Sequence, residues 1–510
     1  MNTKKISLLV GLVAIIIAAV AFFTTQNKSE KSEDKIHAVA TFYPVYEFTK
    51  AVLGDEGDVE LLIKAGTEVH DFEPSTKNLT TIQNADVFVY ADDNMETWVS
   101  NLTKSIDTDK VKFIKMTGDM LLMSGGSEHE EDHDHEEEGH HHAYDPHVWL
   151  SPSRAISLIG YIRRDLAQAY PDKAAVFEKN ADAYIEKLKA LDTRYSTVLS
   201  AAKQKSFVTQ HAAFGYLALD YGLNQISITG VSAESEPTAQ RLAELTTYVK
   251  KQGIKYIYFE ENASAVVSET LAKEAGVQTA VLNPLESLTK EQMDAGKDYI
   301  SVMEDNLAAL QLTIEQEGAT IQPEEEAEKT VYAGYFEDSA IKDRQLSDWS
   351  GEWQSVYPYL LDGTLDQVWD YKAKKSQGAM SYQEYKDYYT VGYKTDVEEI
   401  TIDGKKNTMT FTQNGKSQTF TYKYVGYKVL NYKKGNRGVR FLFETDDANA
   451  GNFKYVQFSD HNISPTDSGH FHIYFGGSSQ EDLLNELNNW PTYYPKGMTG
   501  HEIAQEIVAH

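Results

Sequence analysis

Short apolar runs alternate with longer stretches of helical periodicity along residues 37–315. Runs over residues 37–42, 59–63 and 87–90 are rich in apolar side chains, and between them apolar positions recur every three or four residues. Such alternation predicts strands joined by helices, which pair as parallel sheets. The pattern returns from residue 207 to residue 282. We therefore expect two α/β lobes.

A longer helical pattern lies between the two alternating regions. Ser151 is a residue type preferred at a helix N-cap, and Pro152 suits the first helical position. Helical periodicity continues, with one interruption, through residues 174–199. We expect a long helix that links the lobes rigidly. Further helices are predicted over residues 95–105 and 290–314.

The pattern changes to a two-residue period in the last part of the chain. Residues 316–331 are an acidic stretch containing Pro323, which predicts a linker. Beyond it, Asn414-Gly415 separates two alternating runs, the strongest short-range signal for a β-hairpin. We expect residues 332–510 to form a mainly β domain, a sheet or barrel with a few helices.

The N-terminus carries an export signal. Lys4 and Lys5 precede an apolar run that ends at residue 23. Residues 1–23 are therefore predicted to be a cleaved signal peptide or a retained N-terminal anchor. Their length is at the lower limit for a membrane span, and we place the anchor slightly ahead. Residues 24–36 are polar and are expected to act as a tether. Under either alternative, the remainder lies on the extracellular face of the membrane, N-terminally anchored or secreted.

Composition narrows the chemistry that the chain can perform. The formal net charge of −29 argues against nucleic acid as a partner and favours cations. The sequence contains no cysteine, which excludes disulfides, thiolate catalysis and thiolate metal ligands. A metal site must then use imidazole, carboxylate or water.

Residues 128–142 form a run of histidines and carboxylates. Imidazole and carboxylate bind zinc and similar ions, whereas a packed core cannot accommodate so many charges. We interpret the run as a solvated loop that either collects metal weakly or has no specific role. Its histidines are His129, His133, His135, His140, His141 and His142.

Isolated residues with metal-binding side chains occupy more specific positions. His70, His211 and Glu286 each follow a predicted strand, and His147 precedes the long helix. Ligands of open α/β sheets bind outside the carboxyl ends of strands. Three imidazoles and one carboxylate would make a closed tetrahedral set suited to zinc. A carboxylate in place of one histidine would favour manganese.

A second set of histidines lies near the C-terminus. On a strand, His470 and His472 face the same side, and His461 lies one short loop upstream. Three neutral imidazoles with a fourth position left open are a known zinc arrangement. We assign no role to His37, His501 or His510.

Four motifs give residues 37–315 a family resemblance. They read G-T-E-V-H-D-F-E-P-S around His70, D-P-H-V-W-L-S-P around His147, H-A-A-F-G-Y-L-A from His211 and N-P-L-E up to Glu286. Together they resemble the metal-binding subunits of ABC importers for zinc and manganese. The resemblance implies two lobes joined by a rigid helix, metal held in the cleft, and delivery to a membrane permease with its ATPase. Manganese members carry Glu where this chain has His211, which indicates zinc.

The last part of the chain resembles a different family. The motifs L-S-D-W-S-G-E-W-Q-S-V-Y-P-Y-L-L-D-G-T-L-D (346–366) and G-H-F-H-I-Y-F-G (469–476) are similar to the ZinT family of exported zinc-binding proteins, which has a calycin-like β-barrel. An importer subunit fused to such a domain resembles the AdcA type of zinc-binding proteins. Those proteins are typically lipoproteins, whereas this chain has no lipobox cysteine.

We therefore predict a protein that binds two zinc ions tightly and serves an importer, and we expect a monomer. A surface metal buffer or adhesin without a transport role remains an alternative. A secreted zinc hydrolase is a further one, but it would need an open metal position and a general base. The sequence near the second histidine set contains no H-E-x-x-H or similar base-bearing motif.

Overall fold

The computed structural model describes residues 35–104, 106–125, 144–230, 237–260, 265–318, 330–432 and 435–509. The apolar N-terminal segment (1–23), most of the tether and the six histidines of the 128–142 loop lie outside these residues. In the part of the chain that is described, no helix is both long and apolar enough to cross a membrane. Two compact units are present. Unit 1 comprises Met1–Gly118, Ser153–Leu191 and Leu285–Val302, and unit 2 comprises Asp119–Pro152, Asp192–Pro284 and Met303–His510.

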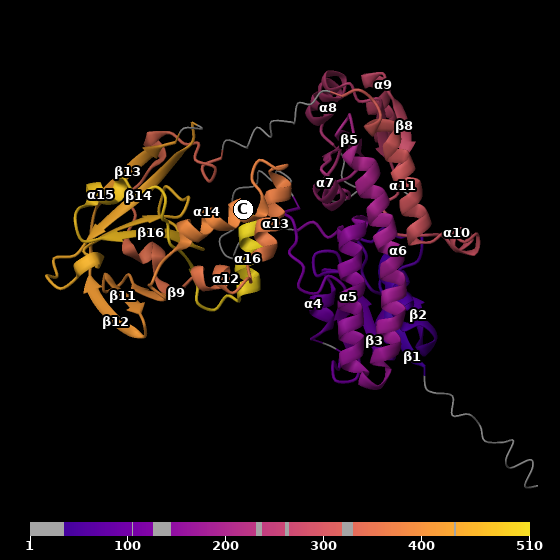
Figure 1. The fold of residues 1–510 in the computed structure, drawn as a ribbon, viewed down its shortest axis with the longest axis horizontal. Coiled ribbons are helices and arrows are strands. Elements are labelled where there is room, and N and C mark those ends of the chain that lie inside the picture. Colours follow the sequence, from indigo (N-terminus) through magenta and orange to yellow (C-terminus); the bar gives the residue numbers. More distant parts are fainter. Residues whose placement is uncertain are drawn as a thin grey trace, which may run out of the picture. The chain divides into compact units, whose positions relative to one another are not determined.

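Unit 1 contains a four-stranded parallel sheet of order β2-β1-β3-β4. Its strands are β1 (Ile36–Ala40), β2 (Gly57–Leu61), β3 (Val87–Tyr90) and β4 (Lys112–Lys115). Helix α2 (Tyr43–Leu53) packs on β1 and β2. The long predicted helix is two helices, α5 (Pro152–Ala169) and α6 (Ala174–Ser200), which run side by side in Figure 1. Carboxyl ends of parallel strands share one edge, and the end of β2 leads into the segment that carries His70.

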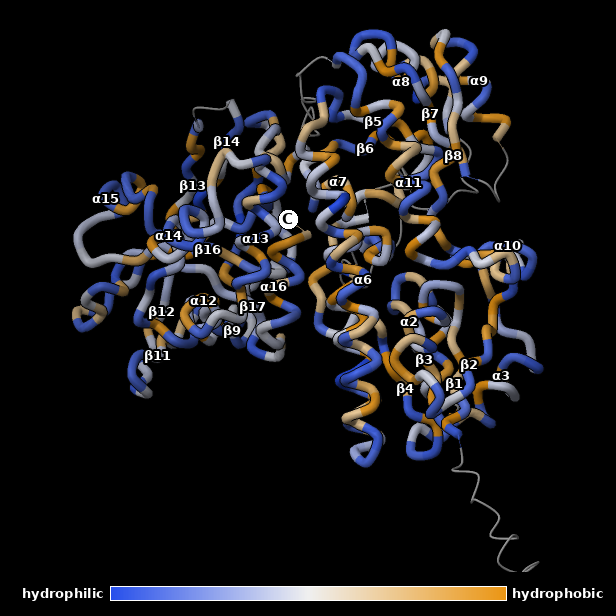
Figure 2. Tube along the Cα trace, turned by 45° about the vertical axis from the view of Figure 1, so that its right-hand side comes forward, coloured by the Kyte–Doolittle hydropathy of each residue, from blue (hydrophilic) through white to orange (hydrophobic). Residues whose placement is uncertain are grey.

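Unit 2 contains a second four-stranded parallel sheet, of order β6-β5-β7-β8. Its strands are β5 (Ser206–Thr209), β6 (Asn224–Ser227), β7 (Tyr256–Phe259) and β8 (Gln278–Val281), and its helices include α7 (Gly215–Tyr221), α8 (Ala239–Gln252) and α9 (Val266–Ala275). Hydrophilic and hydrophobic residues alternate along helix α8 (Figure 2). Its hydrophobic residues Leu245 and Val249 are buried in a core with Ile257 and Leu271. The predicted α/β alternation is confirmed.

The last part of unit 2 is a nine-stranded antiparallel sheet of order β12-β11-β10-β9-β17-β16-β15-β14-β13. The strands are β9 (Gly351–Ser355), β10 (Glu399–Asp403), β11 (Thr408–Gln413), β12 (Lys416–Thr421), β13 (Lys423–Asn431), β14 (Arg437–Glu444), β15 (Tyr455–Ser459), β16 (Phe471–Gly476) and β17 (Thr492–Pro495). The sheet curls in Figure 1 and fits a calycin-like half-barrel, in agreement with the predicted fold. The hairpin at Asn414-Gly415 is confirmed, with both residues at positive φ.

Aromatic side chains fill the inner face of this sheet. Trp349 is fully buried and stacks on Phe458 with ring centroids 4.6 Å apart, and Phe441 and Phe471 pack in the same core. A second core joins helices α13 (Asp366–Lys375), α14 (Tyr382–Tyr393) and α16 (Gly500–Ala509). Most tyrosines in this part of the sequence therefore pack in or against these two cores.

Two predicted helices are wrong in extent. The helix predicted over 290–314 is two helices, α10 (Lys290–Asp294) and α11 (Tyr299–Ile314), because Gly296 adopts φ +85° between them. The helix predicted over 95–105 is only α4 (Val99–Leu102). There the Glu96 carboxylate accepts hydrogen bonds from the backbone N–H groups of Ala91 and Asp92, which holds residues 91–96 in a turn.

Candidate metal centres

The first predicted site combines His70 and Glu286, which lie in unit 1, with His147 and His211, which lie in unit 2. His70 lies in the segment between β2 and α3 (Thr76–Gln83). A capping box between Ser75 and Asn78 fixes the start of helix α3, where this segment ends. Glu286 follows β8. In unit 1, His70 Nε2 lies 3.6 Å from Glu286 Oε1, and both side chains are nearly buried.

The backbone before Glu286 is held by residues distant in sequence. Asn306 on α11 accepts a hydrogen bond from the N–H of Asn283 and donates one to its carbonyl, at 2.8 and 2.7 Å. Trp149 Nε1 donates to the carbonyl of Pro284 at 2.8 Å. Leu285 then adopts φ +58°, a left-handed conformation that a leucine adopts only when its surroundings impose it. Glu286 thus follows a backbone turn that its neighbours fix.

His147 and His211 form the buried half of the first candidate site. Both are fully buried in unit 2, and their Nε2 atoms lie 3.4 Å apart. Each ring places its Nδ1 against a carboxylate: His147 against Asp145 at 2.8 Å, and His211 against Glu260. A carboxylate only accepts, so each Nδ1 carries the proton and each Nε2 is an acceptor. Two acceptors that face each other at 3.4 Å are placed to share one cation.

The spacing of these atoms fits zinc. Within unit 2, His147 and His211 each place one nitrogen within reach of a common ion, and within unit 1, His70 and Glu286 each place one ligand atom within reach of a common ion. Tetrahedral zinc with bonds of about 2.0–2.1 Å holds its ligand atoms about 3.3 Å apart. The distance of 3.4 Å between the two imidazole nitrogens is close to that value.

The second candidate site consists of His461, His470 and His472. His461 follows β15, His470 immediately precedes β16, and His472 lies within it. Their ring centroids are 5.6–5.9 Å apart, and one nitrogen of each lies within 4.8 Å of the others. Tyr332 stacks on His461 and Tyr494 on His470, at 4.6 and 5.1 Å between centroids.

A threonine determines which nitrogen of His472 can bind metal. His472 Nδ1 lies 2.7 Å from Thr492 Oγ1, and that hydroxyl donates its own proton to the carbonyl of Trp490 at 3.0 Å. The hydroxyl must therefore accept from Nδ1–H, which leaves Nε2 as the acceptor. Burial, the neighbouring His461 and His470, and Arg440 lower the pKa of His472 well below its usual value. The ring is neutral at neutral pH, as a metal ligand must be.

Replacing Thr492 by valine is expected to weaken zinc binding at the second site by about 10-fold, because the ring of His472 loses the partner that orients it. Thr492→Ser keeps the hydroxyl and is expected to bind zinc as the unmodified chain does. Chelator competition, in a chain whose first site is disabled by His147→Ala, measures the change. Equal affinity in the valine and serine variants would contradict this role.

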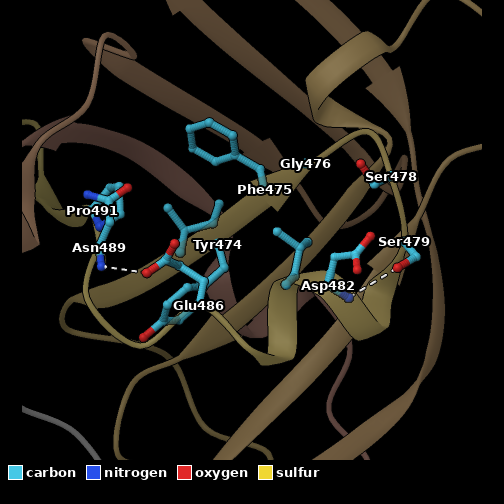
Figure 3. A pocket seen from close by; sticks show the side chains of 11 residues that line it. Tyr474, Phe475, Gly476, Ser478, Ser479, Asp482, Glu486, Asn489 and Pro491 are labelled. Carbon is cyan, nitrogen blue, oxygen red and sulfur yellow. Dashed lines mark hydrogen bonds between the residues drawn. The ribbon is translucent and has the colours of Figure 1, made fainter.

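A cavity of about 210 Å³ lies along β16 beyond His472. Figure 3 shows that Tyr474, Asp482, Glu486 and Asn489 line it, and that Glu486 accepts a hydrogen bond from the backbone N–H of Asn489. None of the three site histidines lines this cavity. A metal-dependent hydrolase would require its metal and its substrate pocket to share residues. The cavity therefore gives no support to the hydrolase alternative.

The remaining histidines are not gathered with these groups in the described residues. His37 lies on β1, 3.9 Å from Glu60 on the exposed edge strand, and His501 is exposed on α16. Sequence reasoning identified all seven ligand-type residues of the two groups but did not single out Asp145, Glu260 or Thr492. Asp145 lies two residues before His147, and Glu260 directly follows β7, so their positions gave a weak signal. The position of Thr492 gave none.

The chain matches two family models. Residues 38–312 match the periplasmic component A of the zinc-uptake complex, ZnuA, and residues 327–510 match ZinT, a periplasmic lipocalin-like zinc-recruitment family. The chain is 62% identical over 516 residues to the zinc-binding protein AdcA of Streptococcus pyogenes, covering 99% of this chain and 100% of that protein. It is 48% identical over 296 residues to the high-affinity zinc uptake system protein ZnuA of Bacillus subtilis, covering 58% and 93%. The crystal structure of Zn(II)-bound AdcA from Streptococcus pneumoniae superposes with a TM-score of 0.84, at 63% identity, covering 93% of this chain and all of that one.

Proposed function

The chain belongs to the AdcA family of zinc-binding proteins, and from this premise we propose that it captures zinc outside the cell and delivers it to an ABC permease. Zinc-uptake proteins of the ZnuA family work with a permease and its ATPase. We propose the same two partners here, with this chain acting as a monomer. In this function zinc is cargo, bound at two sites.

The geometry of His147 and His211 is the main support for a zinc ion at the first site. His147 and His211 are buried, point acceptor nitrogens at each other across 3.4 Å, and have their outer nitrogens fixed by carboxylates. Burying polar groups in this arrangement is costly unless a cation is bound between them. We propose that His70 and Glu286 supply the other two ligands of a closed zinc site. A closed site leaves no position for a reacting water, which suits transport and not catalysis.

The second site is proposed as a zinc-recruiting site. Its three imidazoles leave the fourth position to water or to a ligand from another molecule. We propose that this site binds zinc for recruitment, because its three histidines line no part of the cavity along β16. An open position also lets zinc leave by ligand exchange, which a recruiting site needs.

Relatives and the N-terminal sequence support a location outside the cell. The 62% identical AdcA of Streptococcus pneumoniae is a zinc-binding lipoprotein. This sequence contains no cysteine to be lipidated. We propose that the apolar residues 6–23 direct export and serve as the membrane tether in its place.

Uptake of radioactive zinc in a strain that depends on this chain tests the proposal. Cells that lack the chain should lose uptake at submicromolar zinc and regain it with the unmodified chain. A chain carrying His147→Ala and His211→Ala should not restore it. Restored uptake with that variant would reject transport through the first site. Normal uptake in cells without the chain would leave the buffer or adhesin alternative.

Deleting residues 128–142 is expected to slow zinc acquisition more than it weakens the final affinity, because the histidines and carboxylates of this loop would bind zinc weakly and exchange it quickly. Stopped-flow mixing with a zinc-chelator complex measures the rate, and equilibrium competition measures the affinity. A loop of equal length made of glycine and serine is the control. A tenfold or larger fall in equilibrium affinity would mean instead that the loop supplies a permanent ligand.

A further inference from the structure

The segment between β15 and β16, residues 460–470, carries His461 and has almost no regular structure. His461 itself adopts φ +66°. A left-handed conformation costs a residue with a side chain about 1 kcal/mol and persists only where neighbouring contacts impose it. Some part of the protein must therefore hold this segment in place.

The holding contacts come from residues 342–348, at the start of the β domain. The backbone N–H of Lys342 donates to the carbonyl of Ile463 at 2.9 Å, and the N–H of Ser468 donates to the carbonyl of Asp348 at 2.9 Å. These two bonds fix the middle and the end of the segment. Neither of them reaches the residues that flank His461.

Arg344 contacts Asp460, the residue immediately before His461. Its side chain is fully buried, and its guanidinium lies 4.0 Å from the ring centre of Trp349. Nε donates to Asp348 at 2.9 Å, one terminal nitrogen to Asp460 at 2.6 Å, and the other to the carbonyl of Thr466 at 2.7 Å. The planar fork thus connects both sides of His461 to a rigid part of the core, a geometry that lysine cannot reproduce.

The charges around Arg344 do not balance. One guanidinium faces two carboxylates, those of Asp348 and Asp460. Asp460 Oδ1 accepts from Arg344 and from the N–H of Asn462, whereas its buried Oδ2 has no hydrogen-bond partner among the described residues. A buried carboxylate oxygen without a donor is costly. A divalent cation bound by the adjacent His461 would offset that cost.

We propose that Arg344 is a positioning residue of the second zinc site. It binds Asp460 and Thr466 so that His461 stands beside His470 and His472 before zinc arrives. Through Asp460 it also keeps a buried negative charge next to the ligands. Binding to a preformed site avoids the entropy cost of ordering the 460–470 segment. The inference rests on the proposed function only in assuming that the second site binds zinc.

Zinc affinity of the full chain, with the first site disabled by His147→Ala, tests this role. Arg344→Lys keeps the charge but loses the fork, and Asp460→Asn keeps the shape but loses the charge. Each is expected to weaken zinc binding at the second site by about 10-fold or more. Arg437→Lys is the matched control, because Arg437 pairs with Asp338 and stacks on Phe336 in the same domain without contacting the 460–470 segment. It should leave the affinity unchanged.

Two further readouts separate positioning from simple stability. Far-UV circular dichroism and melting of the metal-free chain should match between Asp460→Asn and its parent, and the visible spectrum of bound Co²⁺ should change in Arg344→Lys because the coordination geometry is altered. Parental affinity in both variants, or a loss of affinity only where the metal-free chain is unfolded, would overturn the inference. If the parent His147→Ala chain, in which Arg344 is intact, binds no zinc, the proposed second site is refuted. The inference about Arg344 then fails with it.

Discussion

Replacing His147 by alanine is expected to reduce the number of tightly bound zinc ions from two to one and to abolish zinc uptake. Zinc bound by four protein ligands gains about 10–16 kcal/mol in peptides at neutral pH, or about 3 kcal/mol per ligand. Loss of one ligand should therefore weaken the first site by about 100-fold or more. The buried Nε2 of His211 would also lose the nitrogen that faces it at 3.4 Å.

Metal analysis of the purified chain after dialysis, followed by chelator competition, measures this result. His37→Ala is the matched control, because this partly exposed histidine lies on β1 away from both candidate groups. It should retain two ions. The zinc affinity of the first site in the Asp145→Asn variant should lie between those of the His37→Ala and His147→Ala variants. In Asp145→Asn, His147 keeps its position but loses the carboxylate that fixes its tautomer. Two tightly bound ions in His147→Ala would show that this residue is not a ligand.

The sequence singles out the ligand-type residues because most of them lie beside an element with a strong local pattern. His70 follows a strand of one parallel sheet, and His211 and Glu286 follow strands of the other; ligands of such sheets bind outside the carboxyl ends of strands. His470 and His472 are two residues apart on a strand, so their shared face follows from strand geometry alone. Local periodicity was sufficient in these cases.

The residues that orient the ligands could not be predicted in the same way. Glu260 and His211 are 49 positions apart, Thr492 and His472 are 20 apart, and Arg344 and Asp460 are 116 apart. Such pairs form only after the strands have taken their order in the sheet, and no local pattern encodes that order. The break between α10 and α11 was missed for another reason. A single glycine within an apolar helical pattern is usually tolerated.

Replacing His472 by glutamine is expected to remove the second zinc site and, in the metal-free chain, to change how the stability of the β15–β16 region depends on pH. The first effect follows from the loss of one of three imidazoles. The second follows from the environment of the ring. Burial, then the neighbouring His461 and His470, and then Arg440 all lower the pKa of His472 in the folded chain. In the unfolded chain its pKa is about 6.5.

The sign of the effect follows from proton linkage. Below about pH 6.5 the unfolded state takes up a proton at His472 that the folded state refuses, so lowering the pH favours unfolding. The contribution of His472 to stability is fully present above about pH 6.5. It is lost as the pH falls through the depressed pKa of the folded state, at up to about 1.4 kcal/mol per pH unit. Glutamine does not titrate and should remove this part of the slope.

Hydrogen exchange of peptides covering residues 455–476, measured at pH 7.5 and 5.5 and corrected for intrinsic exchange rates, detects this change in local stability. The metal-free parent chain should lose more protection at pH 5.5 than the His472→Gln variant. His501→Gln, on the exposed surface of α16, should behave like the parent. An equal loss of protection in parent and His472→Gln would mean that His472 is protonated as easily in the folded chain as in the unfolded one. The neutral ring that its burial and Thr492 are inferred to maintain would then not exist, and the second site would lack a ligand that is ready to bind zinc at neutral pH.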